Sequence, residues 1–523
     1  MFIFEIIVAL LLVGAVLSLW AARLGIPYPA LLALTGAAIA LIPGMPEVSL
    51  DPELALALFV APTLLDAAYD ASPRDLRDNL VPVISLALGA VGLTIAAVAV
   101  LTRLFVPDVG WAAAITLGAI VAPPDASAAI AVLRRVSPPY RVSVILEGES
   151  LFNDASALLV YRIAAAAAMT GTFSGWSVAP MLTLTWGGGV IAGFLLAHLY
   201  LRLTAAVRDI PISILMQFIS TFAVWILAER IGVSAIITVV CYAMTLARHA
   251  PARMDAPRRI ASFAVWDVAV FVLNVIAFIL IGLQLRGIVT RLDASEWRTY
   301  GVCAIAVCAA VIITRIVWVM SHNTLARWRI RRFGARLPRP MTLPTIGSGL
   351  IISWSGMRGI VSLATALALP SGSPGVFPYR DLIVLCAFSV VLATLVIQGL
   401  TLRWLIEWTG VRDDGLVERE VGLARAETAR VALRALEEEP SPISQTLRRD
   451  YEARRRSGAD QSAGSRAERS SSTASLQRRL IDAQRQALID LRARDVIGDA
   501  AFQSAEEELD LLELTADPRI RSG

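Results

Sequence analysis

The chain has 523 residues and a formal net charge of +4; 56% of its residues are hydrophobic and only 17% are charged. Soluble globular proteins are about 45–50% apolar and about 25% charged, so this composition excludes an ordinary soluble protein and indicates a membrane protein. The basic residues lie mainly at the ends of apolar segments, which argues against nucleic acid as a partner and for the lipid bilayer.

The apolar segments predict an all-α polytopic membrane protein. A bilayer core is about 30 Å thick, so a spanning helix needs roughly 20 apolar residues, and this criterion predicts about 13 transmembrane helices. In chain order they cover residues 2–22, 28–43, 53–70, 80–102, 111–133, 141–170, 178–204, 211–229, 233–248, 260–286, 299–321, 346–370 and 382–407. The first lacks the basic start of a secretory signal peptide, so we interpret it as a retained helix.

The loops between these segments differ in their arginine content. Alternate loops hold eighteen arginines on one side and six on the other. Cytoplasmic loops carry the excess of basic residues, so we expect a multi-pass protein of the inner or plasma membrane with its N-terminus outside and its C-terminus in the cytoplasm. An odd helix count is also compatible with two inverted-topology repeats, a common transporter architecture.

The charge pattern divides the chain into a transmembrane domain, residues 1–408, and a cytoplasmic helical tail, residues 409–523. In the tail, apolar periodicity predicts helices over 417–438 and 476–494. The composition of residues 457–475 indicates a disordered linker, and the acidic run at 506–510 belongs to a last helix. The tail consists either of solvated helices without activity of their own or of a regulatory or dimer-supporting element.

The fifth predicted helix contains Pro123, Pro124 and Asp125 in its interior. Two successive prolines remove two backbone donors and break a helix, and broken backbone at membrane depth is tolerated only inside protein or beside a wet cavity. A carboxylate beside freed carbonyl oxygens suits a hard cation. The alternative is a proline kink in which Asp125 caps the second half-helix; both can hold together.

The sixth predicted helix carries Glu149, Ser150, Asn153 and Asp154. Residues four apart share a helix face, so these four side chains form two adjacent oxygen-rich stripes. Ionisable residues inside membrane helices are costly, on the order of 2.5–3.5 kcal/mol each, and usually mark an ion or proton path. The alternative is a buried polar network that only locks helices together.

The twelfth predicted helix embeds Arg358 between Gly356 and Gly359. A buried arginine needs a partner, and we predict Glu149 as that partner, which would support the site and leave Asp154 and Asp125 free to titrate. Secondary candidates lie in other helices: Asp66 as a cation-path residue or satisfied interior acid, Asp267 near water, and Asn274 within the bundle.

Several other site classes find no support in the sequence. The four cysteines lie inside apolar segments without C-x-x-C spacing, and the three histidines form no cluster, so neither a metal centre nor a catalytic triad is predicted. There is no G-x-x-x-x-G-K-[ST] loop, which argues against an ATP-driven pump. We therefore expect no enzyme activity and no cofactor.

Five motifs occur in order along the membrane domain. They are Arg23–Pro27, Ala61–Ala67, Glu147–Asp154, Phe278–Leu285 preceded by Asn274, and Gly356–Ser362. Together they resemble the NhaP-type sodium/proton exchangers of the monovalent cation:proton antiporter family, and the resemblance covers nearly the whole membrane domain.

The resemblance implies a fold of two inverted repeats, two unwound helices that cross near the ion site, and a homodimer. It also implies that Asp154 and Asp125 bind Na⁺ with the Ser150 hydroxyl and the main-chain carbonyl at Pro124, and that Asn153 beside Asp154 marks electroneutral exchange. The chain departs from the family at Pro124, where a threonine is common, and at Asp66, where many members have glutamate. Both departures concern ion selectivity more than the type of reaction.

These observations predict a secondary antiporter that exchanges a monovalent cation, Na⁺ first, for H⁺ in pH and sodium homeostasis. A buried carboxylate prefers to be neutral, so Asp154 would hold either a proton or a cation. The alternatives are a K⁺/H⁺ exchanger, a carrier of an organic solute, or, from a different class, a membrane sensor or scaffold that acts through its tail.

Overall fold

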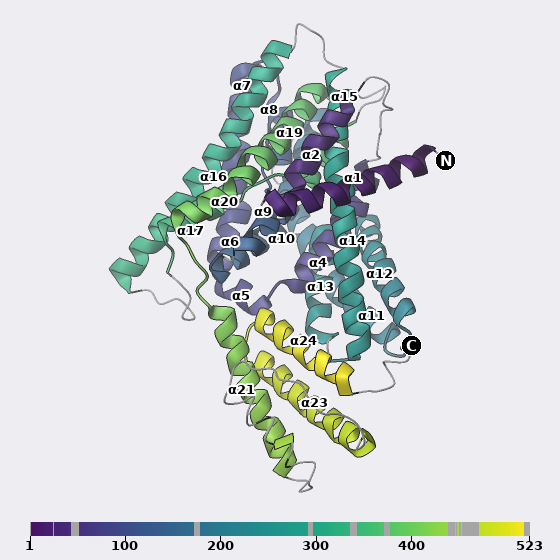
Figure 1. Cartoon of the computed structure of the whole chain (residues 1–523). Helices are drawn as coiled ribbons and strands as arrows, with labels where there is room; N and C mark the ends of the chain where they lie inside the picture. Colours follow the sequence, from purple (N-terminus) through teal and green to yellow (C-terminus); the bar gives the residue numbers. More distant parts are fainter. Residues whose placement is uncertain are drawn as a thin grey trace.

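The computed structural model describes residues 2–24, 26–42, 52–136, 138–171, 178–250, 252–290, 297–334, 343–370, 377–437, 445, 447–448, 451 and 470–516. Within these residues all regular structure is helical, which confirms the predicted all-α class; the count of 13 helices and the two inverted repeats stay predictions. The membrane body forms the larger part of the molecule, and three tail helices lie together at one end of it (Figure 1).

Helix packing divides the membrane body into two bundles. The first, here called the scaffold bundle, consists of α1 (Phe2–Leu24), α2 (Tyr28–Ala40), α3 (Pro52–Ala55), η1 (Leu56–Val60), α4 (Ala61–Asp70), α11 (Val178–Leu203), α12 (Ile210–Ile231), α13 (Ala235–His249) and α14 (Ala256–Leu283). Its helices approach closely where small residues meet. A Cβ atom on Gly36 of α2 would lie 2.3 Å from the carbonyl oxygen of Ile279 in α14, so only glycine allows this contact.

The second bundle, here called the site bundle, contains the polar motifs. It consists of α6 (Leu80–Ile84), η2 (Ser85–Ala90), α7 (Val91–Phe105), α8 (Trp111–Val121), α9 (Ala126–Val136), α10 (Tyr140–Thr170), α16 (Trp297–Phe333), α17 (Ile346–Trp354), α18 (Ile360–Leu367), α19 (Arg380–Ala393), η4 (Thr394–Gln398) and α20 (Gly399–Thr409). Two short helices, α5 (Pro73–Asp78) and α15 (Leu285–Val289), lie on connections between the bundles.

Each predicted membrane segment coincides with a helix or with a pair of half-helices. Eight helices in the described ranges are long and apolar enough to cross a bilayer, and three further apolar helices are shorter. Helix α16 has 37 residues and is therefore about 55 Å long. It exceeds the roughly 30 Å bilayer core and continues past the predicted end at residue 321.

The tail helices form a small unit with its own apolar core. They are α21 (Leu416–Glu437), α23 (Ser470–Ala493) and α24 (Asp499–Ala516), and their interface buries Val421, Leu488, Phe502 and Leu509. The two helices expected over 417–438 and 476–494 agree with α21 and α23. Residues 457–469 of the expected linker lie outside the described residues, and α23 begins at Ser470. The acidic run lies inside α24.

Candidate ion-binding site

Two helices of the site bundle are interrupted, and the interruptions touch. Helix α8 ends at Val121 and α9 begins at Ala126, while α17 ends at Trp354 and α18 begins at Ile360. The backbone N–H of Asp125 donates to the carbonyl of Met357 at 2.7 Å. A Cβ atom on Gly359 would lie 1.7 Å from Oδ2 of Asp125, so glycine is required for this close approach. The crossing brings the predicted cation carboxylate beside the second break.

Arg358 occupies the second break and bonds to the end of the first. Its Nε donates to the carbonyl of Val121 at 3.0 Å and its Nη2 to that of Ala122 at 3.1 Å. The last carbonyls of a helix have no partner within the helix, and the guanidinium group, which has five donors in a fixed fork, satisfies them. Arg358 also donates through Nη1 to the Gly356 carbonyl and through its backbone N–H to Oγ1 of Thr394.

Asp125 caps the second half of the broken helix. Its Oδ1 accepts a hydrogen bond from the backbone N–H of Ser127 at 2.9 Å, which satisfies one free donor at the start of α9. The side chain is half-buried. Its other oxygen, Oδ2, faces the second break at Gly359.

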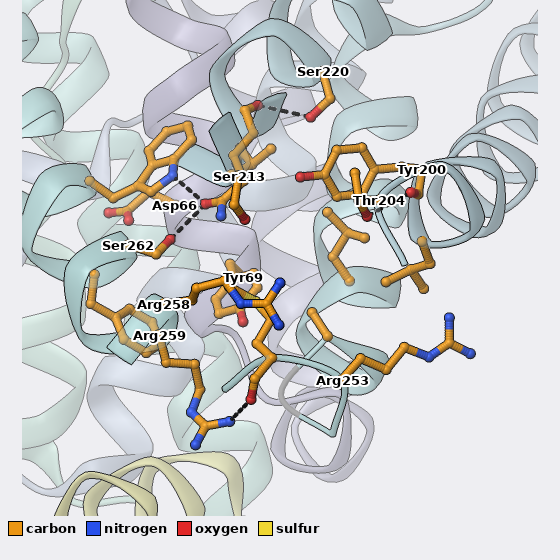
Figure 2. A pocket seen from close by; sticks show the side chains of 18 of the residues that line it. Asp66, Tyr69, Tyr200, Thr204, Ser213, Ser220, Arg253, Arg258, Arg259 and Ser262 are labelled. Carbon is orange, nitrogen blue, oxygen red and sulfur yellow. Dashed lines mark hydrogen bonds between the residues drawn. The ribbon is translucent and has the colours of Figure 1, made fainter. Parts of the chain in front are cut away.

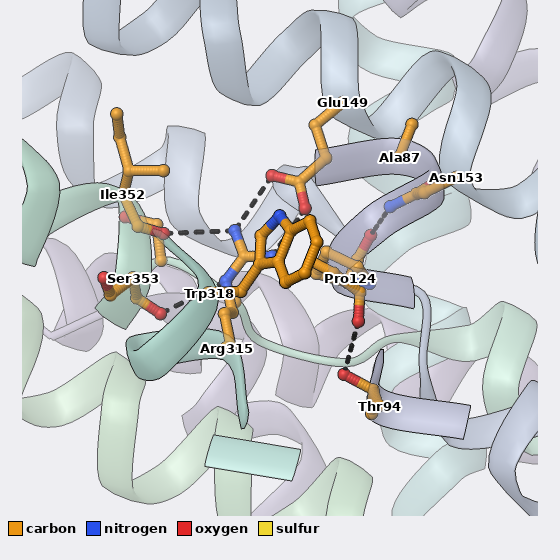
Figure 3. A network of polar contacts seen from close by, with 12 residues as sticks. Ala87, Thr94, Pro124, Glu149, Asn153, Arg315, Trp318, Ile352 and Ser353 are labelled. Carbon is orange, nitrogen blue, oxygen red and sulfur yellow. Dashed lines mark hydrogen bonds and ion pairs between the residues drawn. The ribbon is translucent and has the colours of Figure 1, made fainter. Parts of the chain in front are cut away.

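The predicted pairing of Glu149 with Arg358 is wrong: Glu149 pairs with Arg315 of α16 (Figure 3). Nη1 of Arg315 donates to Oε1 of Glu149 at 2.5 Å and Nη2 to Oε2 at 2.9 Å, while both side chains are almost fully buried. The reason is geometric, because the guanidinium of Arg358 is already directed at the carbonyls of the first break.

Arg315 also holds the second break. Its Nε donates to the carbonyl of Ser353 at 3.1 Å and its Nη2 to that of Ile352 at 3.0 Å, so it satisfies the end of α17 as Arg358 satisfies the end of α8. A Cβ atom on Gly356 would lie 2.3 Å from Cδ of Arg315. We did not predict Arg315, although it is a single charge in the middle of an apolar segment, which is the signal that identified Arg358.

Asn153 connects α10 to the first break. Its Nδ2 donates to the carbonyl of Pro124 at 2.8 Å, and its Oδ1 is buried without a hydrogen-bond partner. The Pro124 oxygen, predicted as a main-chain cation ligand, therefore already accepts one hydrogen bond and retains one lone pair. One helical turn away, Ser156 donates to the carbonyl of Ala87 at 2.8 Å, in the π-helical segment η2.

Asp154 and Ser150 lie on α10, one turn apart on the same face. Both are half-buried. Asp154 is close enough to Asp125 for the two charges to interact, and among the described residues no hydrogen bond holds its carboxylate. The Ser150 hydroxyl and the Asp154 carboxylate of α10 and the Asp125 carboxylate of the first break thus lie on neighbouring elements.

Asp66 lies apart from this cluster. It lines a cavity of about 110 Å³ between α4 and α11–α14 of the scaffold bundle, beside Tyr69 and Arg259 (Figure 2). Neither Asp125 nor Asp154 lines this cavity. Asp267, on α14, is exposed on the scaffold bundle, and Asn274 is half-buried on the same helix.

Comparison with known proteins gives a consistent result. Residues 7–408 match the family described as "Sodium/hydrogen exchanger, transmembrane". An uncharacterized Na⁺/H⁺ exchanger of Mycobacterium tuberculosis is 31% identical over 97% of this chain and 94% of its own length. A sodium, potassium, lithium and rubidium/H⁺ antiporter of Bacillus pumilus is 31% identical over 82% of this chain and 65% of its own. The sodium proton antiporter MjNhaP1 of Methanocaldococcus jannaschii shares the fold, with a TM-score of 0.60 and 17% identity over 78% of this chain and 97% of that one.

Proposed function

The chain belongs to the transmembrane sodium/hydrogen exchanger family and is a membrane antiporter of a monovalent cation and H⁺, and we propose that Asp125 and Asp154 carry the transported ion. Ser150 and the carbonyl of Pro124 complete the oxygen ligands. Glu149, Asn153 and Arg358 support the site, as Arg315 does. The ions are the substrates, and no resident cofactor is part of the proposal.

The charge balance of the site carries this proposal. Three carboxylates, Glu149, Asp125 and Asp154, face two guanidinium groups, Arg315 and Arg358, in one polar cluster. With all five ionised, one negative charge remains, and burying an unpaired charge is costly. Either one proton or one dehydrated monovalent cation neutralises it. Competition between them for the same charge gives obligatory exchange.

The same balance favours electroneutral exchange of one cation for one proton. Because either ion brings the site to zero net charge, the loaded states carry the same charge across the membrane. Na⁺ is the first choice of cation. K⁺ is the second, supported by the Bacillus relative that is named for four alkali cations.

Orientation and assembly belong to the same proposal. The arginine-rich loops and the tail face the cytoplasm, and the N-terminus lies outside, because cytoplasmic loops carry the basic excess. The protein works as a homodimer in the cell membrane, as the resemblance to NhaP-type exchangers implies. Asp66 lies on the cytoplasmic route to the site.

The test uses purified protein in liposomes with an imposed pH gradient and a trapped pH dye. Addition of Na⁺ should move protons, and Asp154→Asn or Asp125→Asn should abolish the response because each removes a charge for which the ions compete. Asp108→Asn is the matched control, since it neutralises an exposed loop carboxylate outside the site. Substituting K⁺ or Li⁺ identifies the preferred cation.

Two results would contradict the proposal. Persistence of full exchange in both aspartate variants would remove these residues from the site. The membrane potential can be set with K⁺ and an ionophore while Na⁺ drives exchange. If the rate of Na⁺-dependent proton movement then depends on this potential, the electroneutral stoichiometry is excluded.

A further inference from the structure

Two of the three histidines lie together in the scaffold bundle. The ring centroids of His198 in α11 and His249 in α13 are 5.6 Å apart, and the ring planes are inclined by 60°. Both side chains are half-buried, and neither lines the cavity that contains Asp66. The sequence alone showed no histidine cluster, because the two residues belong to different helices.

Close packing of α11 against α13 brings the two rings to the same level. A Cβ atom on Gly189 of α11 would lie 3.3 Å from Cβ of Ile237 in α13, and one on Gly193 would lie 2.8 Å from Cβ of Cys241. The contacts advance along both helices together, so α11 and α13 run side by side in the same direction. The next turn of α11 therefore presents His198 beside the last two turns of α13.

A hydrogen bond to the backbone fixes the tautomer of each ring. Nδ1 of His198 lies 2.9 Å from the carbonyl oxygen of Phe194, and Nδ1 of His249 lies 2.9 Å from that of Thr245. Because a carbonyl oxygen only accepts, each Nδ1 must carry the proton and donate it. The other nitrogen of a neutral imidazole, Nε2, then keeps its lone pair. Among the described residues, Nε2 of neither ring is held by a hydrogen bond.

Tautomer and distance both suit a shared metal ion. A histidine that binds a metal almost always donates its other N–H to a carboxylate, a backbone carbonyl or water, as both of these rings do. A Zn–N bond is about 2.0–2.1 Å long, so two imidazoles that bind one ion through Nε2 have ring centroids roughly 5–6 Å apart. The observed separation of 5.6 Å lies in this range.

The surroundings of the pair select the kind of ion. His249 is the last residue of α13, and the C-terminal end of a helix favours a cation. Arg202 follows His198 by one turn and Arg248 precedes His249, and both arginines are exposed. No group of three or more potential ligands that could hold a metal occurs among the described residues, so no carboxylate completes the pair. Ca²⁺ and Mg²⁺, which need oxygen ligands, are therefore disfavoured, whereas imidazole suits Zn²⁺, Cu²⁺ and Ni²⁺.

We propose that His198 and His249 form a two-histidine site for a divalent transition-metal ion of the class of Zn²⁺, Cu²⁺ and Ni²⁺. Nε2 of each ring binds the ion, and water fills its remaining positions. Because α11 and α13 belong to the same bundle, the ion joins two scaffold helices and stabilises their contact. It is distinct from the transported cation, and the site does not depend on the proposed function.

The first experiment measures thermal unfolding of the full chain in detergent, with any affinity tag removed because a polyhistidine tag binds the same ions. Zn²⁺ should raise Tm, since an ion that binds the folded state stabilises it, and a chelator should reverse the rise. Ca²⁺ at the same concentration should have no effect. His198→Gln or His249→Gln should weaken Zn²⁺ binding at least about tenfold, the smaller of the losses caused by removing even an outer-shell partner. His322→Gln is the matched control, because it removes the third histidine, on α16 of the site bundle.

The second experiment counts the imidazoles on the ion. The nitrogen splitting in the electron paramagnetic resonance spectrum of bound Cu²⁺ should indicate two imidazoles in the wild type and in His322→Gln. It should indicate one in His198→Gln or His249→Gln, and none when both substitutions are combined. The chain also has four free cysteines, and thiols bind these metals, so the number of imidazoles decides the question and the total amount of bound metal does not.

Two results would overturn the metal site. One is a Zn²⁺-induced rise in Tm that is the same in both histidine variants as in the wild type. The other is a copper spectrum with fewer than two imidazoles in the wild type, which decides the question even if a variant fails to fold. Asp154→Asn should bind Zn²⁺ like the wild type, so the metal site and the proposed transport site can fail independently.

Discussion

The buried arginines of the site bundle have partners of two kinds. Arg315 neutralises Glu149 and also bonds to two carbonyls, whereas Arg358 bonds to carbonyls and a threonine hydroxyl. Among the described residues Arg358 forms no direct ion pair with a carboxylate, so its positive charge remains available to the cluster around Asp125. The two guanidinium groups lie at helix C-termini, that of Arg315 at the end of α17 and that of Arg358 at the end of α8, where a positive charge is also favoured by the helix dipole.

Removing one partner of the Glu149–Arg315 pair leaves an uncompensated buried charge. We expect Arg315→Met to lower the free energy of unfolding by about 3–5 kcal/mol, and Arg315→Met with Glu149→Leu to recover much of that loss. Thermal unfolding in detergent measures both. Arg162→Met is the control, because its pair with Glu229 is half-exposed and is expected to contribute only about 0–1 kcal/mol. Equal losses for the Arg315 and Arg162 variants would contradict the burial argument.

At the scale of the helices, the crossing of the two breaks depends on a glycine. Gly359→Ala places a methyl group where Oδ2 of Asp125 lies, so the carboxylate must move, and one misplaced ligand weakens cation binding. We expect a higher KM for Na⁺ and a lower rate, with the fold retained. The liposome assay and a thermal-unfolding curve separate these effects. Gly187→Ala on α11, where a Cβ meets nothing within 4 Å, should behave like the wild type in both.

Much of this arrangement could be predicted from local sequence. Two adjacent prolines placed the first helix break, and four-residue spacing placed the polar face of α10. The second break was expected from the resemblance to NhaP-type exchangers. The partner of Glu149 could not be predicted, because two buried arginines compete for it and only the positions of the freed carbonyls decide between them. Those carbonyls belong to helices that are distant in sequence, so no local pattern records the choice. Likewise, the acidic run of α24 was visible as a motif, but its partner Arg259 was not.

For the whole molecule, docking of the tail on the membrane body should depend on pH. Asp510 of α24 pairs with Arg259 of α14, and Glu506 of α24 lies 3.7 Å from the same arginine. Burial raises the pKa of Glu506, with the neighbouring Asp510 contributing and Arg259, Arg485 and Arg492 opposing. Glu506 therefore binds its proton more tightly in the docked tail than in the released tail. The resulting stabilisation of the docked tail is complete below the ordinary glutamate pKa, and it is lost as the pH rises through the raised pKa of Glu506. Tyr69 also faces Glu506.

Gln503 of α24 donates to Asp70 at the end of α4 at 3.4 Å, so spin labels at positions 70 and 503 would measure this dependence as a distance. We expect the distance to increase as the pH rises above the ordinary range of glutamate. Glu506→Gln should flatten the change, since it removes the titrating group. A wild-type distance that is constant over the whole range, or one that shortens with rising pH, would contradict the assignment.

The hydrogen bonds between the two breaks also have a consequence for biosynthesis. Arg358 is separated from Val121, whose carbonyl it satisfies, by 237 residues. At about 5–20 residues per second, ribosomes need roughly 12–50 s to cover that interval. During this time the first half of the site bundle has already entered the membrane with its carbonyls and Asp125 lacking their final partners. Nascent chains interrupted in this interval should be the form of the protein most exposed to membrane chaperones and proteases.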